Sequence, residues 1–157
     1  MVDNYYKSEG YESRKSVGFL IRRASHMLTS EIEAIFAERD VTFVQWVILM
    51  NLRDGLADTS SGLCNNIRYD SGALTRVIDQ LEERKLISRN RSDADRRVVS
   101  LALTSEGKKT VESLLPLVVE KYNLWFEDFT KDEADTLIKL LMKFINSITI
   151  HSKPKGA

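Results

Sequence analysis

The sequence predicts a mainly α-helical protein with a single β-hairpin. Apolar residues recur every three to four positions along most of the chain, which is the spacing of amphipathic helices. Between residues 87 and 103 the pattern changes once, to the alternation that is typical of a half-buried strand. With 157 residues, of which 43% are hydrophobic, the chain has the size and composition of one globular domain with a real core.

Three helices are predicted before the middle of the chain. The first spans about Val17–Phe36, where apolar residues line one face. The second begins at Thr42, which has the spacing of a capping box with Gln45, and it ends at Gly55 because glycine favours the C-terminal cap. A short helix follows over Ser60–Ile67.

A tight turn, a fourth helix and a hairpin come next. Residues 69–72 form the turn, and either Asp70 or Ser71 can cap the helix after it. This helix ends near Lys85, and its apolar face consists of Leu74, Val77, Ile78 and Leu81. Residues 87–91 then read as one strand, 92–95 as a turn and 99–103 as the second strand.

Two long helices complete the chain. The helical spacing returns after Thr104 and continues to Phe129, with a kink expected at Pro116 because proline removes one backbone donor. A capping box at Thr130 opens the last helix, whose apolar face extends to Ile148. Residues 152–157 form a polar tail.

Composition disfavours several classes of function. The single cysteine, Cys64, excludes an intrachain disulfide framework, and the two histidines, His26 and His151, lie too far apart in sequence to suggest a metal site. Neither a catalytic cluster nor a cofactor is therefore expected, and an enzyme is disfavoured. No apolar run approaches the roughly 18–20 residues that cross a bilayer, and the polar start does not resemble a signal peptide, so we expect a cytoplasmic protein without a membrane partner.

The middle of the chain has the order of a winged helix-turn-helix: short helix, tight turn, second helix and basic hairpin. A helix in the major groove presents its N-terminal residues to the base edges, and small side chains allow close approach. We therefore expect DNA contacts from Ser71, Gly72, Ala73, Thr75 and Arg76. One alternative stays open, in which Arg76 pairs with Asp79 or Gln80 on its own helix.

Positive charge is concentrated in the hairpin. The whole chain is neutral, with 23 basic and 23 acidic residues, so any DNA binding must come from local clustering. Arginines at a hairpin tip can enter the minor groove or clamp the phosphate backbone, whereas the plain alternative is a solvated surface turn. The wing residues that we expect to act on DNA are Arg89, Arg91, Asp95, Arg96 and Arg97, with Asp95 orienting an arginine.

Two segments resemble the MarR family of regulators. Residues 95–107, DRRVVSLALTSEG, resemble that family's wing signature, and residues 74–87, LTRVIDQLEERKLI, are similar to its recognition helix and exit. The resemblance covers residues 15–150. It implies one domain over 1–157, with the DNA-binding module at about 42–104 and dimerisation helices at about 13–38 and 105–150.

The resemblance also implies partners. A homodimer would bind palindromic double-stranded DNA, with its two recognition helices about 34 Å apart. Family members commonly bind small aromatic or amphipathic anions between the dimerisation helices and the DNA-binding module, which implies a repressor that such a ligand releases. The candidate cleft residues are Arg22, His26, Trp46, Met50 and Tyr122, although each of them could equally belong to the core or the surface.

Two other functions compete with this interpretation. A winged helix can bind a protein instead of DNA, and it would then not need the arginines of the hairpin. Cys64 could act as a thiol redox sensor, but redox-sensing relatives carry the reactive cysteine in the first helix, where this chain has none. A small buried thiol is the simpler reading of Cys64.

Overall fold

The computed structural model describes residues 4–91 and 99–152. The chain divides into two compact units, one up to Pro116 and one from Leu117 onward, and each is described by itself. Helix α5 runs continuously through the boundary, which coincides with the proline that the sequence singled out. Among the described residues, no helix is both long and apolar enough to span a membrane.

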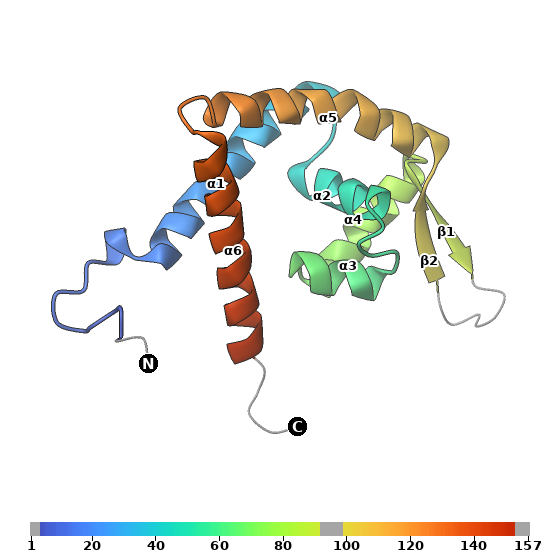
Figure 1. The fold of residues 1–157 in the computed structure, drawn as a ribbon. Coiled ribbons are helices and arrows are strands. Elements are labelled where there is room, and N and C mark those ends of the chain that lie inside the picture. The colour runs from blue at the N-terminus through green and yellow to red at the C-terminus, as the bar shows by residue number, and fades with distance from the viewer. Residues whose placement is uncertain (1–3, 92–98, 153–157) are drawn as a thin grey trace. The chain divides into compact units, whose positions relative to one another are not determined.

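The predicted fold class is confirmed: the described elements are helices and one two-stranded antiparallel hairpin (Figure 1). In chain order they are the 3-10 turn η1 (Ser13–Lys15), α1 (Val17–Phe36), η2 (Ala37–Arg39), α2 (Phe43–Arg53), α3 (Ser60–Ile67), α4 (Ser71–Glu83), β1 (Ile87–Arg91), β2 (Val99–Leu103), α5 (Ser105–Trp125) and α6 (Lys131–His151).

Local sequence signals account for most helix ends. The capping box at Thr42 is complete, since Thr42 and Gln45 each accept a bond from the other's backbone N–H. Of the two predicted caps of α4, Asp70 is the one used: its Oδ1 accepts from the N–H of Ala73 at 2.9 Å. Helix α2 ends just before Gly55, whose φ of +65° is the left-handed conformation that glycine favours.

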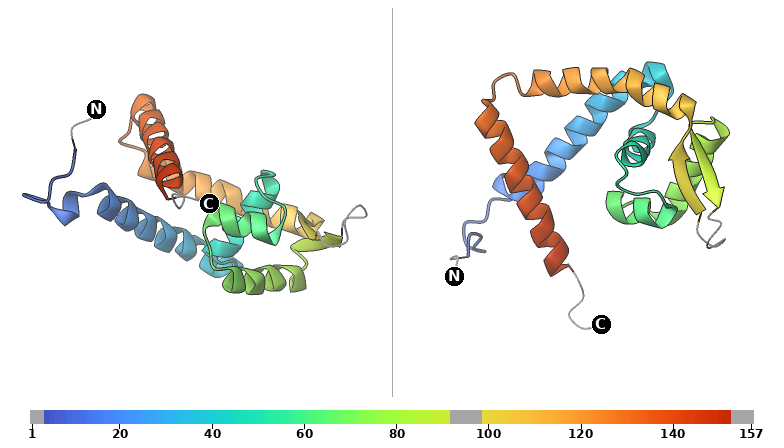
Figure 2. Two further views of the ribbon diagram at one scale, coloured as in Figure 1. Left: turned by 90° about the horizontal axis from the view of Figure 1, so that it is seen from below. Right: turned by 45° about the vertical axis from the view of Figure 1, so that its right-hand side comes forward.

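The core of the first unit joins α1 to the helices and the hairpin that follow it. It combines apolar side chains from every helix of the unit with both strands, namely Ile32, Phe36, Ile48, Leu49, Leu63, Leu74, Ile78, Leu81, Ile87, Leu101, Val111 and Leu114. The antiparallel register pairs Ile87 with Leu103 and Arg89 with Leu101. Figure 2 shows from two further sides that the hairpin lies beside α4, with which β1 is in contact.

A close approach of backbone to backbone fixes the start of α5. The Thr104 hydroxyl donates to the Lys85 carbonyl at 2.6 Å and accepts from the Gly107 N–H at 3.0 Å. The Thr104 N–H donates to the Leu86 carbonyl at 3.1 Å. A Cβ on Gly107 would lie 1.9 Å from the Leu86 oxygen, so only glycine fits where α5 passes the turn between α4 and β1.

The second unit contains the end of α5 and all of α6. Helix α5 ends at Trp125, so Phe126 and Phe129, which the sequence placed on the long helix, lie instead in the turn before α6. The centres of their rings lie 4.9 Å apart. The apolar spacing in the sequence thus continues past the end of the helix, because these two residues pack on each other in the turn. Helix α6 begins with the predicted capping box, in which hydrogen bonds from Thr130 lower the pKa of Glu133.

No residue of α6 is buried. Its apolar side chains nevertheless share one broad face, because residues three, four and seven positions apart lie on the same side of a helix. The exposed members are Leu137, Ile138, Leu140, Leu141, Ile145 and Ile148.

Replacing Gly107 with alanine is expected to lower the free energy of unfolding by about 1–3 kcal/mol, the usual cost of overpacking. Urea denaturation followed by circular dichroism measures this. Gly18→Ala in α1 is the control, since an added Cβ there meets nothing within 4 Å. Equal stability of the Gly107 variant and the wild type would contradict the steric account.

Candidate nucleic-acid interface

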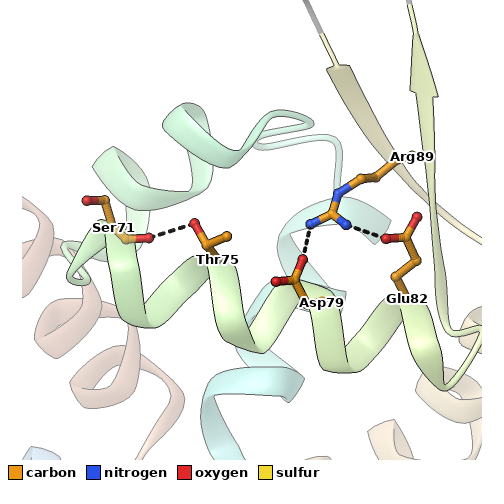
Figure 3. A network of polar contacts seen from close by, with 5 residues as sticks. All are labelled: Ser71, Thr75, Asp79, Glu82 and Arg89. Carbon is orange, nitrogen blue, oxygen red and sulfur yellow. Dashed lines mark hydrogen bonds and ion pairs between the residues drawn. The ribbon is translucent and has the colours of Figure 1, made fainter.

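Helix α4 separates a buried side from an exposed N-terminal half. Leu74, Ile78 and Leu81 are buried, whereas Ser71, Gly72, Thr75 and Arg76 are exposed and Ala73 is half-buried. The Thr75 hydroxyl donates to the Ser71 carbonyl at 2.9 Å (Figure 3), so its lone pairs remain as acceptors on the surface. All five residues expected at the base edges therefore lie within the first two turns of one helix.

The guanidinium of Arg76 makes no hydrogen bond or ion pair within the part of the chain that the structure describes. The alternative in which it pairs along its own helix is not found. Asp79 is bound to Arg89, and Gln80 accepts a bond from Gln45 at 3.3 Å. Arg76 therefore presents on the exposed half of α4 a cation that no described residue neutralises.

Polar contacts hold the C-terminal half of α4 against α2. Gln45 is buried at the start of α2, and its amide donates to Gln80 while its oxygen accepts from Arg84 at 3.2 Å. Arg84 also lies 3.4 Å from the Asp40 carboxylate. These contacts fix the C-terminal half of α4, beyond its exposed N-terminal residues.

The hairpin residues divide into one that is described and four that are not. The Arg89 guanidinium contacts the carboxylates of Asp79 and Glu82 on α4 (Figure 3). The hydrogen bond to Asp79 raises the pKa of Arg89, partial burial opposes this shift, and the charge of Glu82 adds to it. The side chain of Arg91 and the residues Asp95, Arg96 and Arg97 lie outside the described part, so their DNA contacts stay predictions.

The predicted ligand-cleft residues are spread over different environments. Arg22 and His26 are exposed on α1, and Met50 is half-buried on α2. Trp46 is only 6% exposed and packs on Phe36 at 5.4 Å between ring centres, which makes it a core residue of the first unit. Tyr122 belongs to the second unit, where it packs on Trp125 and burial raises the pKa of its phenol.

One crevice was missed by reading the sequence. It has a volume of about 380 Å³ and is lined by Leu52, Arg53, Leu101, Ala102, Leu103, Lys108, Val111 and Glu112. Three elements contribute to it: the end of α2, strand β2 and the start of α5. No sequence motif could have revealed this crevice, because it exists only once these distant segments pack together.

Cys64 is half-buried on α3, and its thiol donates to the Tyr69 carbonyl at 2.9 Å. It lines a crevice of about 290 Å³ between α3 and the start of α4, together with Ser71 and Thr75 among others. In the described residues, no three His, Cys, Asp or Glu side chains are grouped so that they could hold a metal ion.

Comparison with known proteins gives a consistent result. The profile of the MarR family matches residues 41–99, from the segment before α2 to the start of β2. The transcriptional repressor NicR of Pseudomonas putida is 25% identical over 137 residues, which is 87% of each chain. The regulator SarZ of Staphylococcus aureus is 25% identical over 154 residues, covering 98% of this chain and 99% of SarZ.

Solved structures agree. Bordetella bronchiseptica BpsR, whose DNA binding is described as regulated by 6-hydroxynicotinic acid, superposes with a TM-score of 0.75 at 28% identity, covering 85% of this chain and 96% of BpsR. A mutant of Escherichia coli MarR complexed with operator DNA superposes with a TM-score of 0.72 at 28% identity, covering 81% and 91%. The profile match, the relatives and the helix-turn-helix with its hairpin agree: residues 41–99 match the MarR family, and over most of its length the chain is similar in sequence and fold to transcriptional regulators of that family.

Proposed function

We propose that this protein is a sequence-specific DNA-binding repressor that acts as a homodimer on a palindromic operator and is released by a small aromatic or amphipathic ligand. The observation that carries the proposal is the exposed N-terminal half of α4, which combines small side chains with Arg76, an arginine that no described residue pairs with. We also assign the module to about residues 42–104 and the dimerisation helices to about 13–38 and 105–150.

The chemistry of α4 suits the major groove. Ser71, Gly72 and Ala73 let the backbone approach the bases, and the Thr75 hydroxyl offers acceptors. Arg76 can bond bidentately to the O6 and N7 atoms of guanine. The carboxylate of Asp79, one turn further on, is already bound to Arg89, so it does not present an uncompensated negative charge beside the groove.

The rest of the hairpin supplies the remaining positive charge. We assign Arg91, Arg96 and Arg97 to the phosphate backbone or the minor groove, with Asp95 orienting an arginine. These contacts position the protein without reading sequence, whereas the residues of α4 discriminate between bases.

The apolar face of α6 favours a dimer. A helix with an apolar face this broad and no buried residue calls for a partner surface. A second copy related by a two-fold axis provides one, and it presents a second recognition helix to the other half of a palindrome.

The BpsR comparison guides the choice of effector. That relative is described as regulated by a hydroxylated aromatic acid. For this chain we propose an aromatic carboxylate, bound by an arginine near the dimerisation helices. Arg22 on α1 is the first candidate, and His26, Trp46, Met50 and Tyr122 stay candidates for the contacts with the ring. The protein is then a cytoplasmic regulator and not an enzyme.

The DNA-binding proposal predicts a symmetric footprint on the DNA that flanks the protein's own gene. Arg76→Ala is expected to cost about 1–3 kcal/mol of binding free energy. It should also reduce the difference in affinity between operator DNA and scrambled DNA. Titration by fluorescence anisotropy measures both. Lys139→Ala on α6 removes the same charge outside the module and should leave the affinity unchanged. A folded dimer that protects no DNA would instead support the protein-binding winged helix.

The dimer proposal predicts that Ile145→Glu on the apolar face of α6 yields monomers in sedimentation velocity, because a buried carboxylate without a partner opposes association. The matched control is Lys143→Glu, which lies on the opposite side of the same helix. Loss of the dimer in both variants, or in neither, would argue against this face.

The effector proposal predicts that an aromatic carboxylate raises the melting temperature by several degrees and releases the operator, because the ligand binds only the folded state. The primary amide of the same ring is the control compound, since it keeps the shape and removes the charge. Arg22→Ala should abolish the shift, and Arg23→Ala, at the next position of α1, should retain it. A panel of aromatic acids that leaves both melting and DNA binding unchanged would refute this ligand class.

A further inference from the structure

Arg89 is the hairpin arginine whose side chain the structure describes, and although 31% of that side chain is exposed, its guanidinium is engaged by carboxylates of α4. One of its terminal nitrogens bonds to Asp79 and the other to Glu82 (Figure 3). Asp79 and Glu82 are three residues apart on α4 and so share one face of that helix. A single guanidinium therefore joins strand β1 to the recognition helix at two points.

The register of the hairpin explains why Arg89 reaches α4. Arg89 is paired with Leu101, and Ile87, two residues earlier on the same strand face, is paired with Leu103. Ile87 and Leu101 are buried, which identifies this as the inward face of the hairpin. Arg89 is thus the polar continuation of an apolar face that packs inward.

The charges of the cluster disfavour a direct role on DNA. One guanidinium meets two carboxylates, so the cluster carries a formal net charge of −1 and has no positive charge to spare for a phosphate. Moving Arg89 onto DNA would also leave Asp79 and Glu82 without their cation. The raised pKa of Arg89 is consistent with a cation held by these carboxylates.

A two-stranded hairpin is only marginally stable by itself and depends on packing for its orientation. Ile87 anchors the base of β1, and Arg89 anchors the same strand two residues closer to the segment that carries Arg96 and Arg97. On the paired strand β2, the Leu101 N–H donates to the Asp58 carbonyl at 2.6 Å, so Arg89 adds to β1 a charged attachment to α4 that β2 does not provide.

We propose that Arg89 is a positioning residue that fastens β1 to Asp79 and Glu82, and so sets the direction of the hairpin relative to the recognition helix without contacting DNA. The inference rests on the proposed function, because this direction affects affinity only if α4 and the hairpin meet one duplex together. It replaces the expectation, drawn from the sequence, that Arg89 itself contacts DNA.

The decisive variant is Asp79→Asn combined with Glu82→Gln. If Arg89 acts through these carboxylates, the double variant should bind operator DNA about five-fold or more weakly, although it carries two fewer negative charges. If Arg89 contacts phosphate, the same variant should bind more tightly, because it frees a cation and removes repulsion. Glu83→Gln, on the same helix but outside the cluster, measures the effect of removing one carboxylate alone. The two accounts therefore predict opposite signs.

Arg89 variants separate positioning from charge neutralisation. Arg89→Ala should weaken binding to a similar extent, and Arg89→Lys should restore part of the loss because it keeps one charged contact. Adding Arg89→Ala to the double carboxylate variant should cause no further loss. Wild-type affinity in that triple variant would mean that Arg89 merely neutralises Asp79 and Glu82, and it would overturn the inference. Wild-type affinity of Arg89→Ala would overturn it as well.

Hydrogen exchange tests, without DNA, whether the contacts of Arg89 with Asp79 and Glu82 (the Arg89 clamp) hold the hairpin in place. In Arg89→Ala, the amides of β1 and β2 should exchange faster, while those of α6 should not change. Unchanged exchange in the hairpin would overturn the inference even if the wild type binds DNA. Faster exchange in a protein whose wild type binds no operator would support the clamp and refute the proposed function, so the two failures are distinguishable.

Discussion

The contact between Gly107 and the Leu86 carbonyl is the constraint on which the DNA-binding module depends. At this point the end of α4, the start of β1, the end of β2 and the start of α5 meet within a few residues. The Thr104 hydroxyl bonds to both sides of the junction, so the hairpin is closed at its base by hydrogen bonds outside the sheet as well as within it. A side chain at position 107 would push α5 away from the turn and open the base of the hairpin. The positions of both the recognition helix and the hairpin therefore depend on this one junction.

Away from this junction, charged side chains determine what the surface of α4 presents. The first turns of α4 carry an arginine that has no partner among residues 4–91 and 99–152, whereas the following turn carries carboxylates that are bound to Arg89. The positive side chain is thus free where a helix enters the groove and occupied where the helix joins the hairpin. This arrangement explains how a chain with 23 basic and 23 acidic residues can attract DNA at one surface.

The sequence predicted what depends on neighbours along the chain. Both capping boxes, the end of α2 at Gly55 and the position of the hairpin follow from spacings of a few residues, and the structure confirms them. Contacts between residues far apart in the chain could not be predicted from the sequence. The ion pairs of Arg89 depend on strand register, and the packing of Trp46 on Phe36 joins two helices, so neither contact could be read from spacing along the chain. The spacing of Phe126 and Phe129 was mistaken for more helix, because two rings that pack together in a turn can have the same spacing in the sequence.

The first unit and α6 differ in how much of their apolar surface they bury. The first unit buries apolar side chains from each of its helices, while α6 buries none and leaves a face of leucine and isoleucine exposed. Since burial of apolar surface is the main favourable term in association, the exposed face of α6 favours pairing of chains. Two-fold pairing fixes the distance between two copies of α4, and a palindromic operator is bound only when its half-sites match that distance. A ligand that binds near the dimerisation helices then needs only to favour a different distance, by an amount set by its difference in affinity for the two arrangements. In this view the clamp at Arg89 keeps each module rigid, so that a change in spacing between modules is transmitted to the DNA and is not absorbed by the hairpin.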